Sequence, residues 1–240
     1  MNLPDLALQI VYGRLAWALV ASALLLSLLP TILSAPRIRR WTGGLRAVGQ
    51  RTRWLIVAAI FVAMALPGTA SPAYWLTLAL QYPGGLLVGC SAVSLLARWR
   101  RRPVRFTLPA GLALALSVIG LVIYLDTFGI LALGLYYGGF NPVAAPLLAC
   151  AAAIGFAVNV WRGGATGPSA AMLIAVLLFS LLRLPTGNLW DALLDPLLWS
   201  WALGSTVVAC MRLVLARRAP RAAAPTPEPE LVPVRAAGGE

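Results

Sequence analysis

The residues that could do chemistry in this chain lie near the ends of long apolar runs. Arg14 and Arg183 stand near the ends of two such runs, and Asp126 ends a third. An arginine guanidinium can bind a phosphate or a carboxylate through two parallel hydrogen bonds. We therefore expect a site for an anion such as a lipid headgroup. The candidate residues are Tyr12, Arg14, Gly84, Gly85, Asp126, Tyr136, Asn141, Arg183 and Asp191.

These residues also allow a simpler interpretation. An arginine near the end of a membrane helix can extend its guanidinium to the headgroups without a specific partner. Tyrosine is common at the membrane interface for the same reason. Gly84 and Gly85 follow Pro83, and this sequence favours a kink or a close approach of two backbones. The sequence leaves both interpretations open.

The composition offers little for triad, metal or cofactor chemistry. The chain has no His, and its three cysteines, Cys90, Cys150 and Cys210, lie on separate apolar segments. Without an imidazole, the usual base that activates a nucleophile is missing, and so are the ligand sets of zinc and haem. We expect no metal and no cofactor, and motifs alone leave open whether the chain is an enzyme.

The candidate residues are positioned by runs long enough to cross a bilayer. The chain is 60% hydrophobic and 11% charged, whereas a soluble domain is about a quarter charged. A helix needs about 20 apolar residues to cross the hydrocarbon of a membrane. Seven runs are near that length. They are 9–35, 54–70, 73–97 (interrupted at 83–85), 106–125, 142–161, 168–184 and 196–216.

The charges between these runs predict their orientation. All 19 basic residues are Arg, and most lie in 36–53, in 98–105 and after residue 211. With seven spans these segments fall on one side and Asp5, Asp126, Asp191 and Asp195 on the other. Basic loops stay in the cytoplasm, so the net charge of +12 indicates a membrane surface and not nucleic acid.

We therefore expect an all-α, multi-pass protein of the bacterial inner membrane, with seven transmembrane helices, the N-terminus outside and the C-terminus inside. The Gly-rich segment 126–141 is too short for a further span and predicts a re-entrant or interfacial segment after the fourth helix. The membrane domain should cover residues 1–216. Residues 217–240 are rich in Pro and Ala and predict a disordered cytoplasmic tail.

The order of these features resembles the bacterial prolipoprotein diacylglyceryl transferases. The first run opens with Ile10-Val11-Tyr12-Gly13, and the segment 81–89, QYPGGLLVG, precedes a basic cluster as in the family. In the run 117–129, Gly120, Asp126 and Gly129 agree with the family signature. The Gly-containing loop 163–167 is similar to the family's loop before its sixth span, and Arg183 matches the functional arginine that ends that span.

The resemblance implies seven spans and the transfer of diacylglycerol from phosphatidylglycerol to the cysteine of a lipoprotein precursor. The family's histidine corresponds to Pro83 here, its signature arginine to Val118, and its two asparagines to Leu121 and Tyr124. We therefore expect reduced or lost transfer activity, with an anionic phospholipid as partner. A lipoprotein precursor or another membrane protein is a further candidate partner.

Two other functions remain open at this point. The chain could be a non-enzymatic assembly partner or anchor of an envelope complex, which the lack of a catalytic constellation favours. It could also be a small transporter component. Transport requires polar residues in the middle of the membrane, whereas the polar residues here stand near the ends of the runs, so we rank it third.

Overall fold

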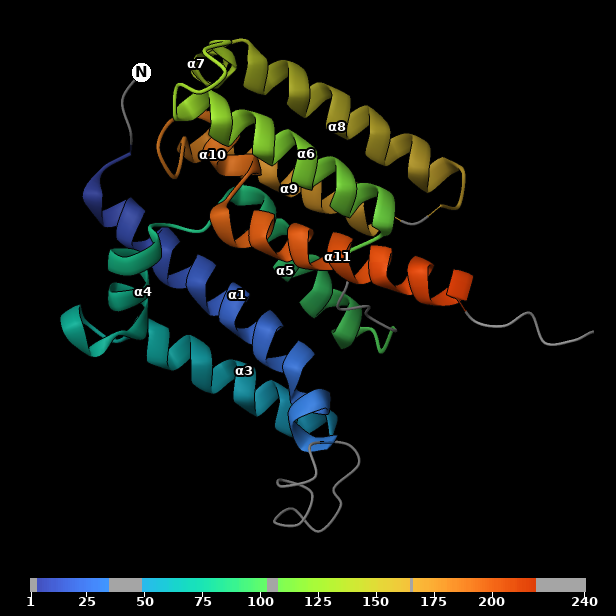
Figure 1. The fold of residues 1–240 in the computed structure, drawn as a ribbon. Helices are drawn as coiled ribbons and strands as arrows, with labels where there is room; N and C mark the ends of the chain where they lie inside the picture. Colours follow the sequence, from blue (N-terminus) through green and yellow to red (C-terminus); the bar gives the residue numbers. More distant parts are fainter. Residues whose placement is uncertain (1–3, 35–48, 103–107, 165, 219–240) are drawn as a thin grey trace, which may run out of the picture.

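The computed structural model describes residues 4–34, 49–102, 108–164 and 166–218, and every regular element in these ranges is a helix (Figure 1). This confirms the expected all-α class. The helices are α1 (Leu6–Ser34), α3 (Gln50–Ala65), η1 (Gly68–Ala70), α4 (Pro72–Leu80), α5 (Gly85–Trp99), α6 (Ala110–Thr127), α7 (Leu135–Gly138), α8 (Ala144–Trp161), α9 (Gly167–Leu182), α10 (Leu189–Leu193) and α11 (Pro196–Arg218). The predicted disordered tail lies, from residue 219 on, outside the described residues.

Among the described helices, α1, α6, α8 and α11 are long and apolar enough to cross a membrane. The helices α5 and α9 are apolar but have only 15 and 16 residues. Helix α3 also has 16 residues and begins with two arginines in its first turn. The structure thus supports four of the seven expected spans by length and composition. For α3, α5 and α9 a membrane span stays a prediction.

The run 73–97, expected to be one interrupted span, is divided into two helices with different neighbours. Helix α4 ends at Leu80, and Gln81 takes the left-handed backbone conformation with φ 64°. Helix α5 begins at Gly85, after Pro83, which disfavours a helical residue before it. Helix α4 packs against α1 and α3, whereas α5 packs against α1 and α9. The break therefore separates α4 from the helix that follows it.

Small residues allow α5 and α9 to approach closely. A Cβ atom added to Gly89 would lie 2.4 Å from the backbone oxygen of Ala171, and one added to Gly85 would lie 2.9 Å from that of Ala175. Ala171 and Ala175 are themselves almost completely buried. Such contacts hold membrane helices together, because apolar side chains gain little from meeting each other in lipid.

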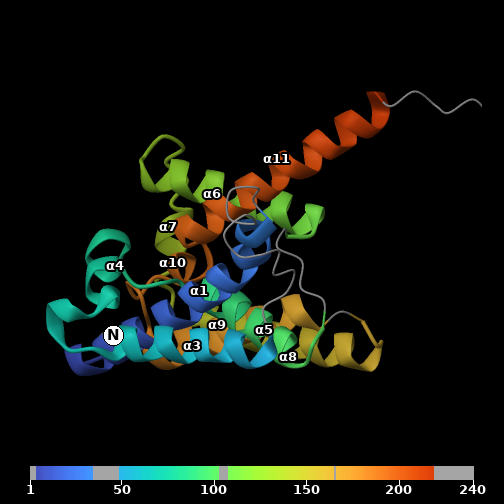
Figure 2. The same ribbon diagram turned by 90° about the horizontal axis from the view of Figure 1, so that it is seen from below.

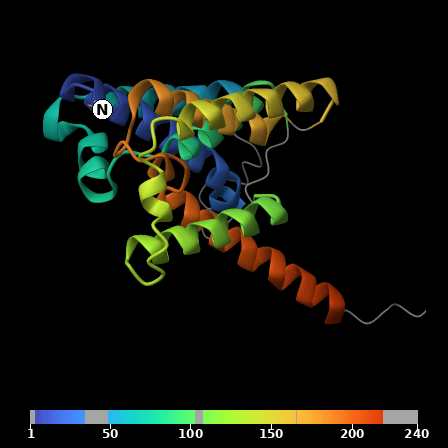
Figure 3. The ribbon, with the colours of Figure 1, turned by 90° about the horizontal axis from the view of Figure 1, so that it is seen from above.

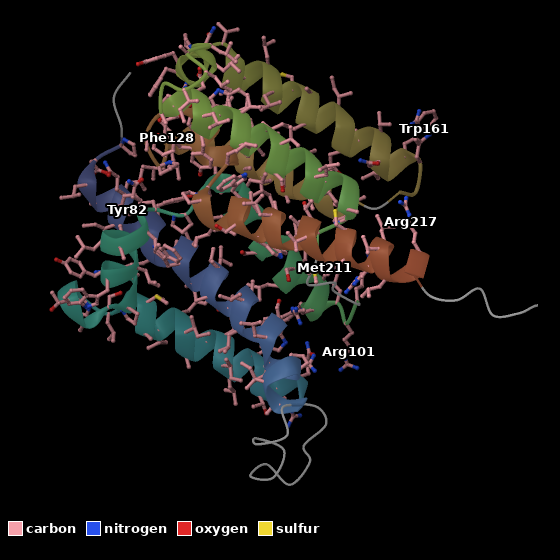
Figure 4. The ribbon with its side chains drawn as sticks, in the orientation of Figure 1. Tyr82, Arg101, Phe128, Trp161, Met211 and Arg217 are labelled. Atoms are coloured by element: carbon pink, nitrogen blue, oxygen red, sulfur yellow. The ribbon has the colours of Figure 1, made fainter. Side chains whose placement is uncertain are left out.

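The two ends of the structure carry opposite charges. Figure 4 shows Tyr82 and Phe128 at the end where α4, α7 and α10 lie in Figure 1, and Arg101, Trp161 and Arg217 at the other end. We call the first the acidic end. Its carboxylates are those of Asp126, Asp191 and Asp195. We call the second the basic end. Its described arginines include Arg98, Arg100, Arg101, Arg102, Arg162 and Arg217.

Seven helices alternate in direction between these ends. In chain order, α1, α5, α8 and α11 begin at the acidic end, and α3, α6 and α9 finish there. Figures 2 and 3 show that α11 diverges from α3 and α8 toward the basic end. In agreement with this, every residue from 211 to 217 is exposed. Helices α6 and α11 are joined instead to each other, for example by Trp199 Nε1–H, which donates to Ser117 O at 3.1 Å.

Candidate functional site

Asp126 closes the loop between α6 and α7. Its Oδ1 accepts hydrogen bonds from the backbone N–H groups of Leu133 (2.6 Å) and Gly134 (2.9 Å). Its Oδ2 accepts one from the N–H of Tyr136 at 2.8 Å. The side chain is buried, and its oxygens are occupied by the chain's own backbone. The structure therefore gives Asp126 a positioning role in this loop.

The segment 126–141 is a loop followed by the short helix α7. The side chains of Phe128, Ile130 and Tyr137 are each more than two-thirds exposed. Exposed aromatic and apolar side chains beside a polar backbone are typical of a segment at a membrane interface. Of the two predicted forms, the interfacial segment agrees better with this exposure than a re-entrant one.

A hydrogen-bond network joins α7 to α10. Tyr136 Oη donates to Asp191 Oδ2 at 3.0 Å, and Thr186 Oγ1 donates to the same oxygen. Asn188, completely buried, donates through Nδ2 to Tyr136 O at 3.0 Å and caps α10 by accepting from Trp190 N–H at 2.9 Å. Burial and the nearby Asp191 carboxylate raise the pKa of Tyr136. Its hydroxyl therefore stays protonated and remains a donor.

Asp195 joins the starts of α5 and α11. Its Oδ2 accepts a hydrogen bond from Gly84 N–H at 2.6 Å, and its Oδ1 accepts one from Leu197 N–H at 2.7 Å. From the other side, Tyr12 Oη donates to Pro83 O at 2.7 Å. The backbone at 83–84 is thus held by α1 and by the start of α11. A Cβ on Gly84 would lie 2.9 Å from the Asp195 Cβ, so the contact requires glycine.

Sequence reasoning placed Asp195 at this end but did not include it among the candidate site residues. The available signal was an aspartate directly before a proline and an apolar run. Aspartate is favoured as the residue that caps a helix N-terminus, and proline is favoured in the first helical position. That signal predicts the bond to Leu197 but not the bond to Gly84, which comes from a helix 111 residues away in sequence.

Arg183 differs from the other candidates because the described residues leave its charge uncompensated. It ends α9 in the left-handed conformation, with φ 54°, and is half-buried. Its guanidinium carbon lies 5.3 Å from the centre of the Phe179 ring, a cation–π contact. Among the described residues its side chain makes no hydrogen bond and no ion pair. Arg183 therefore has donors available for an anion.

Arg14 and Asn141 make only local or weak contacts. Arg14 Nη1 donates to Ala65 O, at the end of α3, over a long 3.5 Å. Asn141 is exposed, and its Oδ1 accepts from Val143 N–H at 2.9 Å in the turn before α8. No hydrogen bond between described residues links either side chain to Arg183 or Asp126. The nine candidates thus do not form one site.

The candidates divide into three sets by their contacts. Tyr12 and Gly84 meet at the turn before α5, and Asp126, Tyr136 and Asp191 belong to the network around α7 and α10. Gly85 is used in packing against α9. Arg14, Asn141 and Arg183 remain separate.

The arrangement can bind an anion at Arg183, and its carboxylates hold the surrounding backbone. No protein-family model, curated protein or solved structure matches the chain. The resemblance to the diacylglyceryl transferases therefore stays a prediction from the sequence.

Proposed function

We propose that this chain is an inner-membrane protein with seven spanning helices that binds the headgroup of an anionic phospholipid through Arg183. The alternating direction of the seven helices supports this number of spans. The arginines of the basic end support a C-terminus in the cytoplasm and an N-terminus outside, because basic loops stay inside. Arg183 then lies at the outer leaflet.

The single observation that carries the binding proposal is the uncompensated guanidinium of Arg183. A half-buried charge at the end of a membrane helix is costly unless an anion or water compensates it. Phe179 contacts the guanidinium from one side, so the planar fork can still donate toward a phosphate. The resemblance adds a functional arginine at the same position.

We propose that binding occurs with reduced or no transfer of the diacylglyceryl group. Asp126 and Asp195 each direct both carboxylate oxygens to backbone N–H groups. Asp191 accepts from two hydroxyl groups. None of these carboxylates is free to act as a general base without breaking a contact that holds the fold, and the chain has no His.

The test compares Arg183→Gln with Arg14→Gln in the full chain, reconstituted in nanodiscs of phosphatidylcholine with added phosphatidylglycerol. Loss of a two-bond contact with phosphate should weaken phosphatidylglycerol binding by about tenfold for Arg183→Gln. The Arg14→Gln variant removes an equal charge from the same end and should bind like the parent. Equal binding by Arg183→Gln and the parent would remove the headgroup site from the proposal.

A separate experiment addresses activity. Expression in a strain depleted of its own diacylglyceryl transferase should give little or no rescue of lipoprotein modification. Full rescue would show that the engaged carboxylates and the substitutions at Pro83 and Val118 do not prevent transfer.

The second candidate function is a non-enzymatic assembly partner or anchor. The engagement of all three carboxylates at the acidic end favours this class over an enzyme. Purification of the full chain in mild detergent should then yield a complex of defined stoichiometry by native mass spectrometry. A clean monomer would count against this candidate and leave the lipid site untouched.

A further inference from the structure

At the basic end, α1, α3 and α5 bring two half-buried arginines together. Arg98 lies in the last turn of α5, and Arg53 lies in the first turn of α3. Both side chains are half-buried, and they are close enough for their charges to act on each other. The sequence has no Asp or Glu from residue 6 to residue 125. These three helices and their loops therefore supply no carboxylate to offset the two charges.

The guanidinium of Arg98 is held in place from one side. Its Nη2 donates to Ser27 Oγ of α1 at 2.8 Å, and Ser27 Oγ donates in turn to Ala23 O at 2.7 Å. Its Nε is buried and has no hydrogen-bond partner among the described residues. A buried donor without an acceptor loses the full free energy of its hydration. An anion that accepted from this edge of the guanidinium would restore that loss.

The surroundings of the two arginines fit an anion at headgroup depth. Helix α3 begins here, and its capping residue, Gly49, provides no side-chain hydrogen bond. The free N–H groups of a helix start add positive potential. The rings of Trp54 and Trp99 lie 4.6 Å apart at the same ends of α3 and α5, and tryptophan is enriched at the level of the headgroups.

We propose that Arg53 and Arg98 form a binding site for a phosphate group, and that the phosphate belongs to an anionic phospholipid of the leaflet at the basic end. A lipid is favoured over a free phosphate because apolar side chains lie beside the site. Leu55 is 68% exposed and Leu96 is 49% exposed, so acyl chains can contact the same two helices. This site is separate from Arg183, at the opposite end of the structure.

The test uses the full chain in phosphatidylcholine nanodiscs with increasing phosphatidylglycerol, and counts bound lipid by native mass spectrometry. Arg98→Gln should weaken the binding of one phosphatidylglycerol by about tenfold, since it removes a charged two-bond donor. Ser27→Ala changes no charge but frees the guanidinium, and should weaken binding by about threefold. Arg102→Gln removes an exposed charge from the same end and should leave the affinity within about twofold of the parent.

Equal effects of Arg98→Gln and Arg102→Gln, together with no effect of Ser27→Ala, would overturn the site, because a diffuse basic surface responds only to total charge. If Arg98→Gln does not fold, as judged by circular dichroism and gel filtration, Arg98→Lys replaces it. That variant keeps the charge, loses the planar fork, and should still bind severalfold more weakly. Affinity equal to the parent would overturn the proposal.

A lipid-free arm separates the two sources of phosphate. Inorganic phosphate, added to the parent in mild detergent, should raise its thermal midpoint much less than phosphatidylglycerol does. A rise from inorganic phosphate as large as that from the lipid, and lost in Arg98→Gln, would overturn the lipid as occupant. Arg183→Gln should retain this site, so the outcome here does not depend on that of the outer site.

Discussion

Replacing Asp195 with alanine tests how firmly the start of α5 is held to the start of α11. The carboxylate makes two short hydrogen bonds, to Gly84 N–H at 2.6 Å and to Leu197 N–H at 2.7 Å, and is 5% exposed. Loss of the cap on α11 costs about 1 kcal/mol. Leaving the buried Gly84 N–H without an acceptor costs about 1–3 kcal/mol more. We expect Asp195→Ala to lower the free energy of unfolding by about 2–4 kcal/mol.

The measurement is an equilibrium unfolding titration of the purified chain in mixed micelles with increasing sodium dodecyl sulfate, followed by circular dichroism. Asp5→Ala is the matched control. Asp5 Oδ1 also accepts from a backbone N–H at a helix start, that of Leu8 at 3.1 Å, but the bond is exposed. The control should lose less than about 1 kcal/mol. If the two variants lose equal free energy, the bond between Asp195 and Gly84 does not hold α5 in place.

Three further outcomes follow from the contacts described. Gly89→Ala should lower the free energy of unfolding by more than about 2 kcal/mol, because its Cβ would meet the Ala171 backbone, whereas Gly155→Ala, with open space around it, should be neutral or slightly stabilising. Tyr136→Phe should cost about 1 kcal/mol; since the pKa of Tyr136 is raised, this difference should be present below about pH 10 and lost as the pH rises further. Asp126→Ala should increase cleavage of the loop before α7 in limited proteolysis without lowering total helix content.

The helices themselves were largely predictable from the sequence. The runs predicted at 142–161, 168–184 and 196–216 correspond to α8, α9 and α11 with ends that differ by two residues or fewer. This agreement arises because apolar length and flanking proline or glycine act locally. The interruption at 83–85 was also predictable. That α4 and α5 would have different neighbours was not, because this depends on packing between distant segments.

The roles of single polar residues were harder to predict. Asp126 was expected to face a ligand, yet its oxygens bind the backbone of residues 133–136. That geometry depends on Gly134, which takes φ 71° and turns the N–H groups toward the carboxylate. The bond between Arg98 and Ser27 joins residues 71 positions apart. Neither spacing nor residue type contains such information.

The shortness of α5 and α9 has a consequence for how the protein fits a bilayer. At about 1.5 Å per residue, helices of 15 and 16 residues cover only about 22–24 Å of the roughly 30 Å of hydrocarbon. These two helices pack against each other, and α10 contacts both. If they span as proposed, the network around Asp191 and Asp195 lies below the level of the surrounding headgroups. The hydrophobic mismatch would then be absorbed inside the protein, while the longer α1, α6, α8 and α11 meet a bilayer of ordinary thickness.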